Sequence, residues 1–142
     1  MNNTEVPDLI LDTHVLMWYS QGIELTSQQV NLIDQAITNS SLYISAISIW
    51  EITMLANKGK IVINIPIKDW INKLLLISKI KIIDLSPDTL IESVLLPNYE
   101  YRDPADRLII ASVRLTNSVL MTFDQKIINY ANLGYLKLVK TC

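Results

Sequence analysis

Short hydrophobic segments alternate with longer helical ones along this chain of 142 residues, and this alternation restricts the fold more than any other feature. The short segments are rich in Ile, Val and Leu, and they lack the apolar–polar alternation of a half-exposed sheet. We therefore expect strands that are covered on both faces. They are predicted over residues 8–12, 42–45, 81–85, 119–122 and 136–139, and 61–63 is a candidate for one more short strand.

The intervals between these strands have the residue spacing of helices. Helices are predicted over residues 13–20, 27–39, 46–57, 67–78, 87–95, 104–117 and 124–131. Ser86 before Pro87, and Asp103 before Pro104, mark two helix starts, because proline is favoured in the first helical turn. This order predicts an α/β fold, a parallel sheet between two layers of helices. No repeat or linker divides the sequence, so we expect one domain over residues 1–142.

Composition excludes several classes of protein. Only three glycines are present, too few for a glycine-rich phosphate loop. No apolar run approaches the roughly 18 residues of a membrane-spanning helix, and the N-terminus does not resemble a signal peptide. The single cysteine, Cys142, fits a reducing cytoplasm. We therefore expect a cytoplasmic protein that does not associate with membranes.

Four acidic residues, Asp12, Glu51, Asp106 and Asp124, occupy unusual places in the pattern. Asp12 and Asp124 each follow a predicted strand, and ligands of parallel sheets bind at the carboxyl ends of strands. Asp106 begins the hydrophobic part of its helix. Glu51 lies inside an apolar helical pattern, where a carboxylate without a partner is costly to bury. It therefore needs a partner that its own helix does not supply.

Several carboxylates at one edge of a sheet would repel each other, by about 4 kcal/mol per pair at about 4 Å and an effective dielectric constant near 20. Either some of them hold protons, or a divalent cation neutralises them. An all-oxygen set of ligands favours Mg²⁺ or Mn²⁺, and Mg²⁺ with its waters is suited to phosphoryl chemistry. Each acid taken alone is also explained as a helix cap or as an acid of the first helical turn.

Four segments resemble, in order, the motifs of the PIN-domain family, and more narrowly those of the VapC-type ribonuclease toxins of bacterial toxin–antitoxin pairs. They are LILDTHVLMW (9–18), ISAISIWEI (44–52), RDPADRLIIAS (102–112) and LMTFD (120–124). The resemblance implies a PIN fold, a three-layer α/β/α sandwich, and RNA hydrolysis that depends on Mg²⁺ or Mn²⁺. It also implies a homodimer and a cognate VapB-type antitoxin that places a basic side chain in the acidic pocket.

The resemblance assigns roles to particular residues. The metal-binding and catalytic acids would be Asp12, Glu51, Asp106 and Asp124, with Asp103 an accessory at best. Thr13 and Thr122 match small hydroxyl residues that flank the first and fourth acids in the family. Independently of the resemblance, Arg107 is a candidate contact with the substrate, because it adjoins Asp106 in the sequence.

Other residues and other functions stay open. We interpret His14 as part of a packed first helix, and Trp18, Trp50 and Trp70 as core or interface anchors rather than base-stacking residues. Three interpretations of the arginines stay open: they hold an RNA phosphate, they pair with neighbouring acids, or they are solvated charges on a helix. Alternative functions are a PIN-like nuclease of DNA or RNA processing without an antitoxin, a phosphoryl-handling α/β domain, and a non-catalytic binding module whose acids only cap helices.

Overall fold

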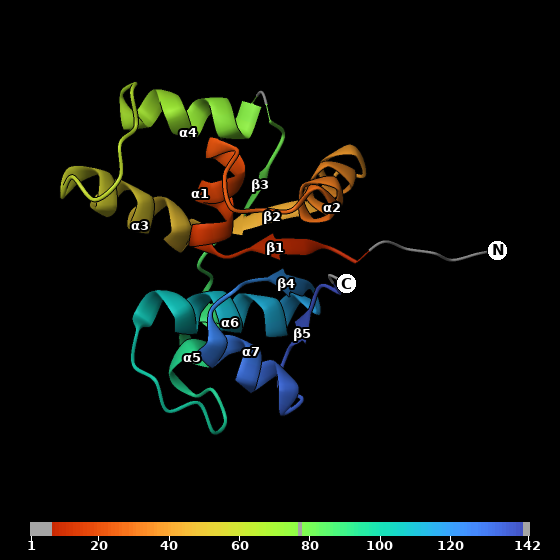
Figure 1. The fold of residues 1–142 in the computed structure, drawn as a ribbon. Coiled ribbons are helices and arrows are strands. Elements are labelled where there is room, and N and C mark those ends of the chain that lie inside the picture. The colour runs from red at the N-terminus through yellow and green to blue at the C-terminus, as the bar shows by residue number, and fades with distance from the viewer. Residues whose placement is uncertain (1–6, 77, 141–142) are drawn as a thin grey trace.

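A parallel sheet of five strands forms the centre of the molecule in the computed structural model, which describes residues 7–76 and 78–140 (Figure 1). The strand order is β3-β2-β1-β4-β5. The strands are β1 (Leu9–Leu11), β2 (Leu42–Ser45), β3 (Lys81–Ile83), β4 (Val119–Met121) and β5 (Lys137–Leu138). All five lie within the segments that the sequence predicts as strands.

Helices cover both faces of this sheet, so the predicted three-layer α/β/α sandwich is confirmed (Figure 1). On one face lie α1 (Thr13–Gln21), α2 (Ser27–Thr38), α3 (Ala46–Asn57) and α4 (Ile67–Leu76). On the other lie α5 (Pro87–Val94), α6 (Pro104–Thr116) and α7 (Gln125–Asn132). None of the helices in the described part of the chain is long and apolar enough to cross a membrane.

Alternate residues of each strand point into two separate hydrophobic cores. In β1, Leu9 and Leu11 belong to the core beneath α1–α4, whereas Ile10 belongs to the core beneath α5–α7. In β4, Met121 and Leu120 divide in the same way. Both faces are therefore buried, which explains why the strands are apolar throughout.

The strand candidate at 61–63 is wrong. Residues 61–63 contain no strand, and Ile61 and Ile63 instead pack as irregular chain against the core beneath α1–α4. Their side chains are apolar because they cover that core, and burial alone does not distinguish a strand from a packed connection.

Three strands lead into helices at the same edge of the sheet, two of them directly. The residue at each junction is a helix N-cap: Asp12 between β1 and α1, Ser45 between β2 and α3, and Asp124 of α7, three residues beyond the end of β4. Asp103 caps α6, whose first turn lies at this edge as well (Figure 1). Helix N-termini carry a partial positive charge, so this edge favours acidic side chains and anions.

Candidate active site

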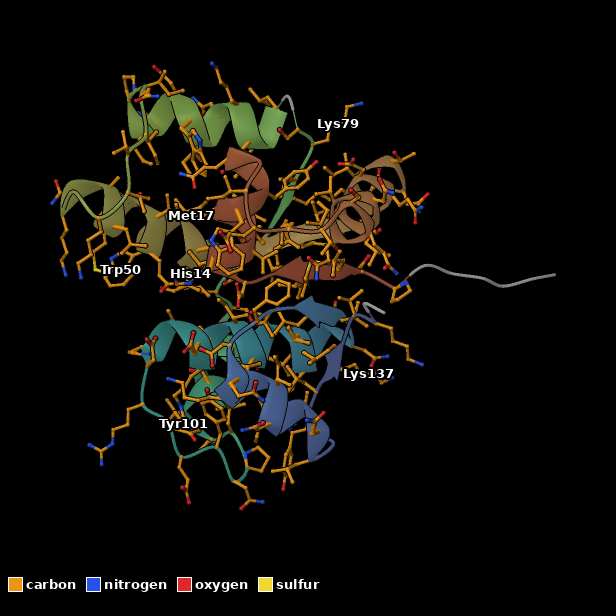
Figure 2. All side chains as sticks on the ribbon, in the orientation of Figure 1. His14, Met17, Trp50, Lys79, Tyr101 and Lys137 are labelled. Carbon is orange, nitrogen blue, oxygen red and sulfur yellow. The ribbon has the colours of Figure 1, made fainter. Side chains whose placement is uncertain are left out.

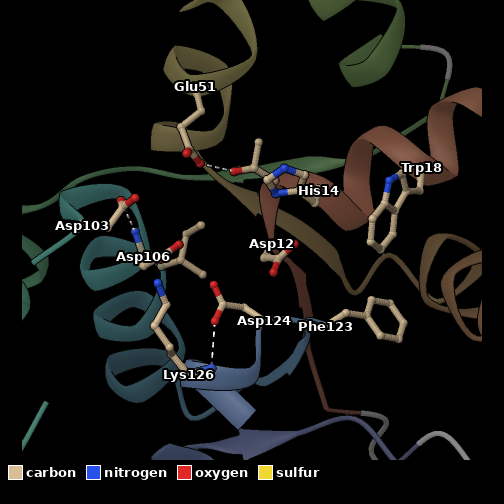
Figure 3. Close-up of a pocket in the computed structure, with 11 residues that line it drawn as sticks. Asp12, His14, Trp18, Glu51, Asp103, Asp106, Phe123, Asp124 and Lys126 are labelled. Carbon is tan, nitrogen blue, oxygen red and sulfur yellow. Dashed lines mark hydrogen bonds between the residues drawn. The ribbon is translucent and has the colours of Figure 1, made fainter. Parts of the chain in front are cut away.

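A pocket of about 340 Å³ lies at the carboxyl ends of β1 and β4 (Figure 3). The four acids predicted from the sequence all line it, although they come from four different elements. Asp103 joins them as a fifth acid. The lining residues are Asp12, Thr13, His14, Trp18, Glu51, Asp103, Asp106, Ile109, Phe123, Asp124 and Lys126.

Asp12 is the most enclosed of these acids, with 8% of its surface exposed. Its Oδ1 accepts a hydrogen bond from the backbone N–H of Val15, at 3.1 Å, and its Oδ2 accepts one from the Thr122 hydroxyl. Burial raises the pKa of Asp12, and these two hydrogen bonds, which stabilise the carboxylate, oppose that rise. Asp12 is thus both a helix cap and a wall of the pocket.

Thr122 connects two of the acids. Besides donating to Asp12, its Oγ1 accepts a hydrogen bond from the backbone N–H of Asp124, at 3.1 Å. The Oδ1 of Asp124 in turn accepts from the backbone N–H of Lys126, at 2.9 Å. Thr122 therefore contacts both Asp12 and Asp124.

Glu51 has a partner outside its own helix, as expected. The Thr13 hydroxyl of α1 donates to Glu51 Oε1 and also makes a 2.9 Å hydrogen bond with Ser48. The apolar pattern around Glu51 predicts a buried carboxylate, but the buried residues of α3 are Ser48 and Ile52, and Glu51 is only partly buried. Burial is the main cause that raises the pKa of Glu51, and Asp103 adds to the rise.

Asp106 and Asp103 form the wall nearest to α6. Asp103 Oδ1 caps this helix by accepting from the backbone N–H groups of Ala105, at 2.9 Å, and Asp106, at 3.2 Å. The Asp106 carboxyl is partly buried among other acids. Burial and then the charges of Asp103 and Asp124 raise its pKa to about 7. Near neutral pH, this carboxyl is therefore partly protonated.

Lys126 supplies the one Lys or Arg side chain that lines the pocket. Its Nζ lies 5.2 Å from the centre of the Tyr101 ring. Across residues 7–76 and 78–140, the only ion pair joins Arg114 to Glu92, so Lys126 neutralises none of the five acids directly. The pocket keeps an excess of negative charge.

The chemistry of these ligands fits a hard divalent cation, because carboxylate oxygens are the ligands that Mg²⁺ and Mn²⁺ prefer. Within the described residues, however, no three Asp, Glu, His or Cys side chains lie close enough together to hold a metal ion. The carboxylates surround the pocket, and several have raised pKa values. A cation would have to draw these carboxylates inward and neutralise their mutual repulsion.

Arg107, a predicted substrate residue, has a different environment. Its guanidinium donates to four backbone carbonyls, those of Ser93, Val94, Tyr99 and Tyr101, at 2.5–3.2 Å. It does not line the pocket. Arg107 therefore holds the end of α5 and the segment before α6 in place, and the structure does not bring it to the acids.

Sequence reasoning missed five residues of the pocket wall: His14, Trp18, Ile109, Phe123 and Lys126. The prediction that His14 is packed is wrong, since this side chain is exposed. Phe123 and Lys126 flank Asp124 in the sequence, and that closeness to a predicted ligand was the signal available. Of the tryptophans, Trp70 packs on a core, Trp18 lines the pocket, and Trp50 on α3 is 58% exposed (Figure 2).

Comparison with known proteins gives a consistent result. The PIN domain family model matches residues 9–133. Ribonuclease VapC22 of Mycobacterium tuberculosis is 31% identical over 120 residues, which cover 84% of this chain and 88% of that protein.

Solved structures share the fold. The VapBC2 complex of Rickettsia felis, bound to a DNA fragment from its promoter, matches with a TM-score of 0.67 and 18% identity over 92% of this chain and 96% of the other. FitAcB from Neisseria gonorrhoeae matches with a TM-score of 0.63 and 17% identity, over 93% and 96% of the two chains.

Proposed function

We propose that this chain, which belongs to the PIN-domain family, is a metal-dependent endoribonuclease and the toxin of a VapBC-type toxin–antitoxin pair. The 31% identical relative is named a ribonuclease, and the fold is that of solved toxin–antitoxin complexes. One observation carries the proposal: five carboxylates line a single pocket whose one Lys or Arg, Lys126, pairs with none of them. Such a pocket favours a divalent cation.

Asp12, Asp106 and Asp124 would hold Mg²⁺ or Mn²⁺, and Glu51 would complete the set of ligands or orient the attacking water. A cation bound there supplies a water of lowered pKa and neutralises charge on the phosphodiester. The chain's own contribution is to hold the acids in place. Thr122 fixes Asp12 relative to the backbone of Asp124, and Thr13 fixes Glu51.

RNA carries the same sign of charge as this pocket, so the substrate needs positive charge as well as the cation. Lys126 is the side chain in position to supply it, because its ammonium group lies at the pocket wall and pairs with no carboxylate there (Figure 3). We assign to Lys126 a contact with a phosphate of the bound RNA.

The antitoxin would inhibit the enzyme by placing a basic side chain among the acids. An apolar groove supports this assignment, since it adjoins the pocket and shares Glu51 and Asp103 with it. Its other walls include Ile47, Trp50 and Met54 of α3. A segment with apolar residues beside an Arg or Lys matches both surfaces. A homodimer, measurable by light scattering of the purified protein, is part of the same proposal.

A non-catalytic binding module remains the second candidate, because Asp12, Asp103 and Asp124 do cap helices. A PIN-like nuclease without an antitoxin is a third, and cleavage of DNA in preference to RNA would favour it. The ribonuclease and the non-catalytic binding module predict different roles for Asp106. Its side chain caps no helix in this structure and yet lies in the pocket, so only the ribonuclease needs it.

The test compares RNA cleavage by the wild type, Asp106→Asn and Asp69→Asn, with Mg²⁺ or Mn²⁺ and with EDTA. Asp69 is a matched control, because it is also an acid of a first helical turn but is exposed on α4. We expect cleavage that EDTA and Asp106→Asn abolish and Asp69→Asn leaves unchanged. Equal cleavage by Asp106→Asn, or none by the wild type, would overturn the proposal.

A further inference from the structure

Aromatic rings form one side of the acidic pocket. The Trp18 and Phe123 rings lie 5.6 Å apart, centre to centre, at an angle of 44°, and the His14 ring lies 6.2 Å from Trp18. All three line the pocket. Figure 3 shows Trp18 and Phe123 on one side, Glu51 and Asp103 on the other, and Asp12 and Asp124 between them. We call His14, Trp18 and Phe123 the aromatic wall.

The aromatic wall does not serve the packing of the protein. Phe123 is 42% exposed, although it directly follows buried β4 and Thr122, and His14 is exposed as well. Neither Trp18 nor Phe123 belongs to either hydrophobic core in the described residues. Because the two rings are tilted, neither covers the face of the other completely. Flat apolar surface thus stays open to the pocket.

We propose that the aromatic wall binds a nucleobase of the RNA beside the scissile phosphate, with the base stacked on Phe123. This inference rests on the proposed function, since it takes RNA as the substrate. Phe123 immediately precedes Asp124, so a base on its ring is the neighbour of a phosphate among the acids. Stacking on aromatic rings is the usual way in which proteins hold an unpaired base.

The wall selects for RNA that offers an unpaired base. In a duplex, each base is stacked between its neighbours, and its face is closed to Phe123. Stacking also tolerates every base type, because each base has a π face. The aromatic wall therefore determines which phosphate enters the site and does not distinguish one base from another.

An apolar side chain of a protein partner is the other candidate occupant. The positions of the two surfaces favour the base. The apolar groove of the proposed antitoxin site shares Glu51 and Asp103, which lie across the acids from the wall (Figure 3). The wall is therefore separate from that groove, and its own three side chains are all rings.

Binding, measured without cleavage, is the appropriate test. In an Asp106→Asn background with Mg²⁺, a fluorescently labelled single-stranded adenosine homopolymer is titrated against proteins with Phe123, Phe123→Leu, Phe123→Tyr or Trp50→Leu. A chain of equal length with abasic riboses, and the adenosine strand paired to its complement, are the second and third probes. Trp50 is the matched control, because it is an exposed aromatic residue of the other groove.

We expect Phe123→Leu to weaken binding of the single strand roughly 5- to 150-fold, the loss of one stacked base. Phe123→Tyr should restore it, Trp50→Leu should not change it, and the abasic chain should not respond to any of the substitutions. Equal binding by Phe123→Leu, or the same loss with the abasic or paired probe, would overturn the inference. Failure of the ribonuclease proposal gives a different result. In that case the protein that keeps Phe123 does not bind the probes, and the wild type, which also keeps Asp106, does not cleave RNA.

Discussion

The Thr122 hydroxyl donates a hydrogen bond to Asp12, which lies 110 positions earlier in the chain. The same oxygen accepts from the backbone N–H of Asp124. One small side chain thus joins the carboxyl end of β1 to that of β4 and sets the spacing of two acids. The resulting pocket depends on tertiary structure, not on any one motif.

Replacing Thr122 with Val should damage both stability and activity. Valine has nearly the same shape but lacks the hydroxyl, so buried Asp12 loses a donor at a cost of about 1–3 kcal/mol in the free energy of unfolding. Urea denaturation and RNA cleavage assays measure the two effects. Thr122→Ser, which keeps the hydroxyl, should retain both properties, and a fully active Thr122→Val protein would contradict this role.

Stability without metal should fall as the pH rises from about 4 to about 7. In the folded protein Asp106 keeps its proton up to about pH 7, because its pKa is raised to about 7. In the unfolded chain it loses the proton near the ordinary pKa of 3.8. The free energy of unfolding therefore decreases across this pH interval, because the unfolded chain is already ionised while the folded protein still has to lose its proton. Asp106→Asn should raise the free energy of unfolding at about pH 8 by about 1–2 kcal/mol, because it removes a charge that burial and the neighbouring acids destabilise. Partial exposure to solvent limits the size of this gain.

Thermal melting at several pH values checks this behaviour. At about pH 3 the wild type and Asp106→Asn should be nearly equally stable, because the carboxyl of the wild type is then largely protonated in the unfolded chain as well as in the folded protein. Addition of Mn²⁺ near neutral pH should raise the melting temperature of the wild type and not that of the variant. A stability difference that is the same at every pH would show that ionisation of the Asp106 carboxyl is not its cause.

Tyr99→Phe should stabilise the protein. Tyr99 is 6% exposed, and its hydroxyl is the one buried side-chain polar atom without a hydrogen-bond partner in the described residues. Removing it should raise the free energy of unfolding by about 1 kcal/mol. Tyr130→Phe is the matched control, because the Tyr130 hydroxyl donates to the Pro97 carbonyl at 2.5 Å, and its loss should destabilise. Loss of stability in Tyr99→Phe would disprove the prediction.

Replacing Arg107 should affect stability and not RNA binding, whereas replacing Lys126 should affect RNA binding and not stability. Arg107→Lys leaves carbonyls of residues 93–101 without donors, so the melting temperature should fall, by the equivalent of about 2–3 kcal/mol, while RNA affinity stays unchanged. Lys126→Ala should weaken RNA binding and reduce its salt dependence without affecting the melting temperature. The exposed Arg102 serves as control. Unchanged RNA affinity in Lys126→Ala would exclude it as a phosphate contact.

The order of elements and the edge that holds the acids could be predicted from the sequence. Strands without alternation and helices with clear caps define a parallel sheet, and the position of Asp12 and Asp124 after two strands then places them together. The expectation of one domain over residues 1–142 stays a prediction. So do the roles of Asp12, Glu51, Asp106 and Asp124.

Contacts between distant elements could not be predicted in the same way. The Thr13 hydroxyl reaches Glu51 only because α1 and α3 pack side by side, and the direction of Arg107 depends on where the chain before α6 runs. The exposure of His14 could not be predicted either. Its apolar neighbours in the sequence suggest a packed side chain, but His14 lies in the first turn of α1 and lines the pocket.

The most direct measurement is the anomalous diffraction of crystals soaked in Mn²⁺ near neutral pH. A shared divalent cation predicts one strong peak inside the pocket, between Asp12, Asp106 and Asp124, with these carboxylates turned toward it. Crystals of Asp106→Asn should lose the peak or show it weakened. A pocket without any peak at a Mn²⁺ concentration that supports RNA cleavage, or a peak bound elsewhere, would contradict the account.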